Sequence, residues 1–386
     1  MVHSSYHYLL WLWNLPLWGR SCCLYRTLDY HSWPYRFHAK IGWTLTLIIP
    51  IHVDDGLAIC NSLSLYDWFV REISKHVDFI SLGPVTNTRY LGQRIVRDRT
   101  NRVIRVSQSD LVISLLEDWG MSECKVSSTP LPHNFTQLPP CSPNACPDIS
   151  DADITLAYQR LVGSLTYLAI CTWPDLVYTA MALGQYNASP TRSHLVIAKG
   201  VLRYLAGTVH LGLMFSLQNQ HLPESIQPHS LYCGLSDADW ASDQSDWRSI
   251  SRYCFYFSNS LVSWSAQKQR TVSTSSTESE YYALANAMKE AIWLKLFLTL
   301  TELWPSHPLP ILCDNQSARL IASTDAVLFR TKHIDVRYHF IHEHVTSGSS
   351  PLYWVPSSDM VADIFTKPLP TVLFLCHRHF FGLFPT

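Results

Sequence analysis

Four carboxylates, each at the edge of an apolar run, are the residues of this sequence best suited to chemistry. They are Asp237 in Leu-Ser-Asp-Ala-Asp-Trp, Glu280 in Ser-Thr-Glu-Ser-Glu-Tyr, Asp314 in Leu-Cys-Asp-Asn and Asp363 in Val-Ala-Asp-Ile-Phe-Thr-Lys. Hard divalent cations take oxygen ligands, and two such ions about 4 Å apart can activate a water and stabilise the leaving oxygen of a phosphodiester. If one fold gathers these acids, the pattern predicts a site for Mg²⁺ or Mn²⁺.

Each acid also has an interpretation without chemistry. Thr277-Glu278-Ser279-Glu280 fits a helix capping box, so Glu280 could cap its own helix, and Glu278 is a rival for its place in a metal site. Asp237 could be a turn residue, Asp314 an N-cap and Asp363 a solvated helix acid. The metal interpretation is favoured because the four acids follow the order strand, helix, strand, helix.

The elements around the acids predict an α/β fold with a mixed sheet. Apolar runs predict strands at 231–241, 252–258, 261–266, 309–313 and 352–355. A long helix is expected from Thr277 to about Leu303, with two further helices before the last strand and a final helix from Asp359 onward.

Upstream, two β-hairpins are predicted. Apolar runs at 45–53 and 57–59 flank Asp54-Asp55-Gly56, which is either a pair of displayed carboxylates or a plain turn. A second hairpin joins 89–97 to 102–106. It carries five arginines that suit a phosphate backbone, although an ordinary solvated edge fits equally well. These arginines are Arg94, Arg97, Arg99, Arg102 and Arg105.

Composition limits the class of protein. The 386 residues leave room for two or three domains, and 47% hydrophobic residues with 14 Trp exclude a disordered chain. A net charge of -1 means that a surface for nucleic acid must be local. The 11 cysteines form no paired C-x-x-C elements, which favours free thiols in a reducing compartment.

No membrane segment is predicted. The apolar run 8–18 has no Lys or Arg before it and contains Pro16, and the run 43–53 is too short to cross a bilayer. We therefore expect an intracellular protein, cytoplasmic or nuclear, without a predicted oligomeric state. A zinc site at His333, His339, His342 and His344 is disfavoured because no Cys or carboxylate completes the set.

At several stretches the chain resembles the end of a copia-type retrotransposon polyprotein, where the later part of a reverse transcriptase is followed by a ribonuclease H domain. The resemblance runs from about residue 43 to the end, with the motifs in the order of that family. The upstream matches are His52-Val53-Asp54-Asp55, Tyr90-Leu91-Gly92, 158–168 and 202–205, and the downstream ones are 236–241, 275–281, 330–339 and 362–369.

The resemblance implies a ribonuclease H-like mixed five-stranded sheet at 231–370. Before it would come a partial polymerase palm with the primer-grip hairpin at 42–126, a linker at 127–156 and a helical thumb or connection module at 157–217, and after it a tail at 371–386. The segment 1–41 shows no sustained helical or strand period, and it is either a degenerate N-terminal remnant or an unusual core segment. Asp237, Glu280, Asp314 and Asp363 would hold two Mg²⁺ ions and cut the RNA strand of an RNA–DNA hybrid. Asp54 and Asp55 would belong to the palm.

The chain also departs from the family pattern. Before Asp54 the only acid is Asp29, in a context that resembles no polymerase motif, so a third palm ligand is missing and polymerase activity is expected to be lost. Further departures are His52 for Tyr, Trp173 for Arg, Gly200 and Ala206 at basic positions, and Arg252 for Gly. Two hypotheses follow: a truncated retroelement protein with an active ribonuclease H, or an inert remnant that at most binds nucleic acid.

Overall fold

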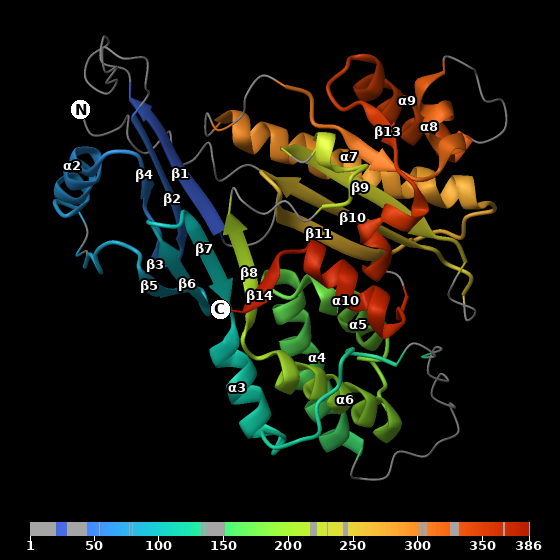
Figure 1. The fold of residues 1–386 in the computed structure, drawn as a ribbon, viewed down its shortest axis with the longest axis horizontal. Coiled ribbons are helices and arrows are strands. Elements are labelled where there is room, and N and C mark those ends of the chain that lie inside the picture. The colour runs from blue at the N-terminus through green and yellow to red at the C-terminus, as the bar shows by residue number, and fades with distance from the viewer. Residues whose placement is uncertain are drawn as a thin grey trace. The chain divides into compact units, whose positions relative to one another are not determined.

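The structure is a computed structural model that describes most of the chain. The described residues are 21–28, 45–53, 55–76, 78, 80–132, 135, 151–216, 222–229, 231–241, 246–300, 303, 307–324, 332–365 and 367–385. They divide into two compact units, Met1–Gln93 with Leu294–Ser306, and Arg94–Trp293 with His307–Thr386. Figure 1 shows the elements of both units.

The first unit is built on an antiparallel sheet. Its elements are β1 (Ser21–Leu28), β2 (Leu45–His52), β3 (Asp55–Gly56), β4 (Ile59–Cys60), helix α2 (Leu63–Ile73) and β5 (Asn87–Tyr90). Strand β2 pairs with β1 over its whole length and folds back on β3 and β4, as the first hairpin prediction expected. Leu47 and Ile49 pack with Leu65 of α2 in a small core.

Strand β1 lies in the segment 1–41, in which the sequence showed no sustained period. All eight of its residues pair with β2, from Ser21 opposite His52 to Leu28 opposite Leu45. No strand was predicted at 21–28, where the structure has one. A strand whose pairing is set by a partner about 20 residues away need not show its own alternation.

The second unit contains a sheet that the sequence revealed only in part. The predicted arginine hairpin is present as β6 (Gln93–Asp98) and β7 (Val103–Ser107). Strand β7 continues antiparallel to β8 (Leu211–Ser216), and β8 pairs with β14 (Leu383–Pro385). The segment 371–386, expected to be a tail, thus contains helix α10 (Thr371–Phe380) and a strand.

Helices follow this sheet. They are α3 (Ser109–Asp118), then α4 (Asp151–Cys171), the 3₁₀ turn η1 (Pro174–Leu176), α5 (Val177–Gly184) and α6 (Arg192–Thr208) in the segment expected to be a helical module. Helix α4 begins six residues before that segment, inside 127–156, which was expected to be a linker. Thr191 caps α6 by accepting from His194 N, and the His194 ring accepts from Thr191 N at 3.0 Å. Trp173, which stands where the resemblance expects Arg, is fully buried in the core and meets Tyr204 edge to face.

Two glycines weaken this module without serving its packing. Gly163 in α4 and Gly200 in α6 have no atom within 4 Å of the position that a Cβ would take. We expect Gly163→Ala and Gly200→Ala each to raise the free energy of unfolding by about 0.5–1 kcal/mol, because alanine loses less backbone entropy in a helix. Urea denaturation followed by circular dichroism measures the gain, and a loss of stability in either variant would contradict the expectation.

The acid-bearing sheet matches the prediction in strand number and type. It has β9 (Tyr232–Asp239), β10 (Ile250–Phe257), β11 (Ser260–Lys268), β12 (Ile311–Cys313) and β13 (Leu352–Trp354), in the spatial order β11-β10-β9-β12-β13. Strands β9 to β11 are antiparallel, whereas β12 runs parallel to β9 and β13. The accompanying helices are α7 (Ser276–Leu300), α8 (Gln316–Ser323) and α9 (Lys332–Thr346).

Hydrophobic side chains join this sheet to the helical module in one core. Leu235 and Cys254 of the sheet belong to the same buried cluster as Leu165 and Leu202 of the module. Trp264 on β11 also donates its indole N–H to the carbonyl of Ala169 in α4 at 2.8 Å.

The final helix expected from Asp359 is not formed, and this prediction is corrected. The segment consists of two 3₁₀ turns, η3 (Ser357–Asp359) and η4 (Val361–Phe365). Another 3₁₀ turn, η2 (Gln227–His229), lies before the first strand of the sheet. Pro368 and Pro370 remove two backbone donors, so an α-helix cannot continue through them. The α-helix begins only at Thr371, with Pro370 at its N-cap, and Asp363 lies on η4.

Candidate metal centre

Asp237, Glu280 and Asp314 come together at one edge of the acid-bearing sheet. One carboxylate oxygen of each lies within 4.8 Å of the other two. Strands β9 and β12 are parallel neighbours, with Ile311 opposite Gly234 and Leu312 opposite Leu235. Continuing that register by two residues brings Asp314 level with Asp237, so the carboxyl ends of the strands place both acids at one edge.

Glu280, and not Glu278, points into this cluster. Glu278 Oε2 accepts hydrogen bonds from the backbone N and the hydroxyl of Thr274, both at 2.7 Å, and Glu278 N donates to Ser275 Oγ. Glu278 therefore caps α7. Glu280 lies two residues further along the helix and is buried.

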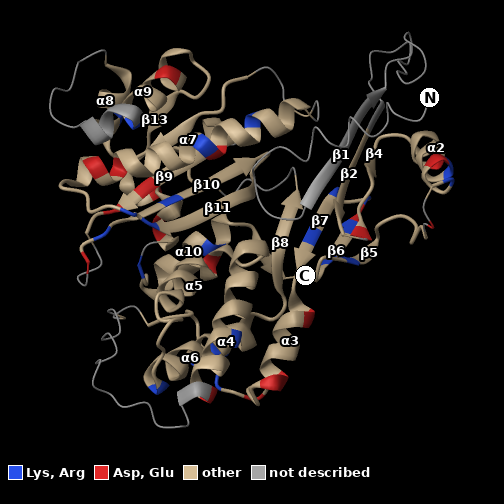
Figure 2. Cartoon of the chain, turned by 180° about the vertical axis from the view of Figure 1, so that it is seen from behind, with Lys and Arg blue, Asp and Glu red and all other residues tan. Residues whose placement is uncertain are grey.

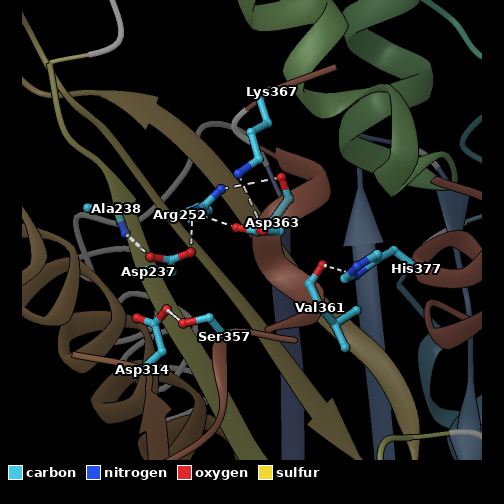
Figure 3. Close-up of polar contacts among 9 residues, drawn as sticks. All are labelled: Asp237, Ala238, Arg252, Asp314, Ser357, Val361, Asp363, Lys367 and His377. Carbon is cyan, nitrogen blue, oxygen red and sulfur yellow. Dashed lines mark hydrogen bonds and ion pairs between the residues drawn. The ribbon is translucent and has the colours of Figure 1, made fainter. Parts of the chain in front are cut away.

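The capping alternative for Asp314 is also decided by local geometry. Asn315 is the N-cap of α8, where its side-chain oxygen accepts from Ala318 N at 2.9 Å. Asp314 remains available and is oriented by Ser357, whose hydroxyl donates to Asp314 Oδ2 at 2.7 Å (Figure 3). Asp237 is oriented by the backbone N of Ala238, which donates to Oδ1 at 2.7 Å.

Because these carboxyl groups are buried close together, it is unfavourable for all of them to be ionised without a cation. Loss of hydration and the neighbouring Asp237 raise the pKa of Glu280 to about 10. Burial likewise raises the pKa of Asp237 to about 6, although Arg252 opposes the shift. Glu280 Oε2 is buried without a hydrogen-bond partner among the described residues. Three converging carboxylates with such an oxygen fit one hard divalent cation, whose charge would offset these costs.

Asp363 reaches the cluster through Arg252 instead of joining the three acids directly. Arg252 on β10 is the cross-strand partner of Asp237 on β9. Its guanidinium forms ion pairs with Asp237 Oδ2 and, at 2.9 Å, with Asp363 Oδ1 (Figure 3). Lys367 approaches the other Asp363 oxygen at 3.6 Å. Of the four predicted ligands, three have carboxylate oxygens within 4.8 Å of one another, and the fourth is paired with two cations.

Arg252 is the residue of this site that sequence reasoning missed. The sequence marked it only as a departure from a common Gly. Its role depends on strand register, which the sequence did not predict: Arg252 lies directly opposite Asp237 on the next strand and so shares its face of the sheet.

The five predicted arginines do not form one surface. Direct partners in an antiparallel pair share a face, so Arg94 (opposite Ser107) and Arg105 (opposite Val96) lie on one face, whereas Arg97 (opposite Ile104) lies on the other. Arg94 is also engaged by Asp110, whose two oxygens it contacts at 3.0 and 3.1 Å. The exposed members of the set are Arg97, Arg99 and Arg102. Figure 2 marks the Lys and Arg positions of the chain in blue.

The structure describes the other residues considered from the sequence only in part. Asp54 and Asp29 lie outside the described residues, and Asp55 is exposed on β3 opposite His52. His342 and His344 contact the Ala322 carbonyl and the Ser349 hydroxyl, and the side chain of His333 is not described. Seven cysteines are free thiols: Cys60, Cys124, Cys171, Cys233, Cys254, Cys313 and Cys376. Within the described ranges, no helix has the length and apolarity of a membrane span.

Comparisons with known proteins place the chain among retroelement sequences. It is 33% identical over 359 residues to the retrovirus-related Pol polyprotein from transposon TNT 1-94 of Nicotiana tabacum, covering 92% of this chain and 26% of that protein. It is 37% identical over 325 residues to the corresponding polyprotein from transposon RE2 of Arabidopsis thaliana, covering 84% and 21%. The chain thus spans about a quarter of the length of these relatives. No protein-family model matches it.

A shorter relative and a solved structure complete the comparison. An uncharacterized mitochondrial protein of Arabidopsis thaliana is 34% identical over 243 residues, which cover 63% of this chain and 92% of that protein. The foamy viral protease-reverse transcriptase in complex with double-stranded DNA aligns with a TM-score of 0.43 and 11% identity, over 80% of this chain and 46% of that one.

Proposed function

Because this chain belongs to the retrovirus-related Pol polyproteins of copia-type transposons, we propose that its residues 231–370 form a metal-dependent nuclease that cuts the RNA strand of an RNA–DNA hybrid. The observation that carries the proposal is the meeting of Asp237, Glu280 and Asp314 within 4.8 Å. Family membership alone would allow a decayed site, whereas three converging buried or half-buried acids retain the donors that a cation needs.

Each residue of the proposed site has a definable task. Asp237, Glu280 and Asp314 would hold Mg²⁺ or Mn²⁺, and a bound ion would act as a Lewis acid toward a phosphodiester. Ser357 keeps one Asp314 oxygen fixed, and the indole of Trp354 donates to the Asp314 carbonyl at 3.1 Å. The backbone N of Ala238 fixes Asp237 in the same way. These contacts hold two acids in place before a cation binds, which lowers the ordering cost of binding.

A second candidate function is nucleic-acid binding without cleavage. It is favoured by the exposed Arg97 on β6 and by the exposed Arg99 and Arg102 between β6 and β7. Binding through phosphate contacts should weaken steeply with salt, and Arg97→Glu with Arg99→Glu should weaken it further. Unchanged binding in that double variant would exclude this surface.

Hybrid cleavage tests the proposed function directly. The whole chain is incubated with an end-labelled RNA–DNA hybrid and Mg²⁺ or Mn²⁺, next to an Asp314→Asn variant and a sample with chelator. We expect RNA fragments from the unaltered chain, and a rate lower by about 100-fold or more in Asp314→Asn, because the variant replaces a ligand carboxylate by a neutral amide. Asp314 is half exposed, so the variant should fold. Fragment release no greater than in Asp314→Asn would reject the nuclease.

A further inference from the structure

Arg252 holds a buried positive charge inside the acid cluster. Only 4% of its side chain is exposed, and its Nη2 contacts both Asp237 Oδ2 and Asp363 Oδ1. Its Nη1 donates to the backbone carbonyl of Asp363 at 3.3 Å. One guanidinium therefore joins β9 to η4 across the site (Figure 3).

We propose that Arg252 acts as a built-in cation that excludes a second divalent ion, so that the chain binds one ion, at Asp237, Glu280 and Asp314. The inference rests on the proposed function in taking that acid cluster as a cation site. It specifies how many ions the site holds, and it assigns to Asp363 a partner within the chain instead of a metal.

The oxygens between Asp237 and Asp363 are already engaged. Asp237 uses Oδ1 for the Ala238 N–H and Oδ2 for Arg252. Asp363 has Arg252 at Oδ1 and Lys367 at Oδ2. A second ion on these oxygens would lie next to a guanidinium of like charge, in the space that the guanidinium fills. Glu280 Oε2, by contrast, remains without a hydrogen-bond partner among the described residues.

Arg252 is buried within the sheet, so a bound cation cannot displace its side chain into solvent. Its backbone lies in the middle of the sheet, opposite Asp237 on β9 and Ala266 on β11. By contrast, the Lys367 side chain is 55% exposed, and it pairs with Asp363 at 3.6 Å.

A merely structural role for Arg252 predicts a different result. In that case the guanidinium neutralises buried acids for folding, and removing it would lower stability without creating a place for another ion. The number of ions bound per folded chain separates the two roles, and it does not depend on whether the protein cuts a substrate.

Mn²⁺ binding to the whole chain tests the inference, with free Mn²⁺ measured by electron paramagnetic resonance during titration. We expect one ion per unaltered chain and two per Arg252→Gly chain, with the added ion lost in Arg252→Gly combined with Asp363→Asn. The matched control is Lys367→Met, which removes the exposed cation from Asp363 and should leave one ion bound. If circular dichroism shows that Arg252→Gly is unfolded, Arg252→Met keeps the aliphatic stem and carries the same expectation.

The outcomes distinguish this inference from the proposed function. Two ions on the unaltered chain, or no additional ion on either folded Arg252 variant, would overturn the inference even if hybrid is cleaved. A step from one ion to two would support it even if neither protein cuts hybrid, and in that case the nuclease proposal alone would fail.

Discussion

Replacing Glu280 by Gln should stabilise the fold at neutral pH and remove cation binding at the same time. Burial and the charge of Asp237 raise the pKa of Glu280 from 4.5 to about 10, so at pH 7 the folded protein holds a proton that the unfolded chain has released. Taking up that proton at pH 7 costs the folded state on the order of 3 kcal/mol. Gln resembles the protonated acid in shape and avoids this cost, but it cannot supply a carboxylate to a cation.

The sign of the pH dependence gives the prediction a second check. A carboxyl whose pKa is raised by folding contributes its full stability below the unfolded value, here 4.5, and loses it as the pH rises toward the folded value of about 10. The advantage of Glu280→Gln over the unaltered chain should therefore be near zero at pH 4.5 and grow toward neutral pH. Urea denaturation at both pH values, in chelator, measures this difference.

The control for this pair of effects is the neighbouring acid on the same helix. Glu278 is half-buried and caps α7 through Thr274, outside the acid cluster. Glu278→Gln should leave Mn²⁺ binding unchanged and alter stability by no more than about 1 kcal/mol. If Glu280→Gln still binds Mn²⁺ as tightly as the unaltered chain, Glu280 is not a ligand. If it is less stable at pH 7, the buried carboxylate is ionised and paired in a way that the structure does not show.

The sequence predicted those parts of the fold that have strong local signals. The three antiparallel strands, the long helix and the strand before Asp314 were each marked by an apolar run. Strands β8 and β14 were not predicted. Strand β14 has only three residues, and the two strands, which pair with each other, lie more than 160 residues apart in the sequence. Long-range pairing of short strands depends on tertiary contacts and leaves little local pattern.

The sequence predicted the acidic residues of the candidate site, but not the contacts that Arg252 makes with them. Short contexts identified the acids, and the choice of Glu280 over Glu278 agrees with the side chains that the structure places in the cluster. The role of Arg252 could not be read from composition, because it depends on strand register and on a buried side chain that reaches a residue 111 positions away. Local sequence also suggested a helix at Asp359, where the structure has two 3₁₀ turns.

Gly234→Ala should be among the most damaging single changes in the acid-bearing sheet. Gly234 lies opposite Phe255 in the β9–β10 pair, and the Phe255 ring covers it. A Cβ at Gly234 would lie 2.4 Å from Cε1 and 2.7 Å from Cζ of that ring. Phe255 is 1% exposed, so its ring has no open space into which it could move. We expect a loss of about 3 kcal/mol in the free energy of unfolding, at the upper end for an overpacked core.

The same change should weaken cation binding, because Gly234 also sets the pairing that aligns two ligands. It lies opposite Ile311 of β12, three residues before Asp237 and in the register that brings Asp314 level with it. A shift of β9 away from Phe255 would separate the two carboxylates. Mn²⁺ titration of the folded fraction measures the loss, and Gly163→Ala, which meets no atom within 4 Å, is the matched glycine control.

A double-mutant cycle identifies the cause of the damage. Phe255→Leu removes the ring atoms that a Cβ at Gly234 would strike, although it leaves a cavity of its own. If the clash with the ring is the cause, Gly234→Ala should cost much less stability in the Phe255→Leu background than in the unaltered chain, with a coupling free energy above about 1 kcal/mol. If the losses of stability in the two single variants simply add up in the double variant, the glycine is required for its backbone conformation, and contact with the Phe255 ring is not the cause.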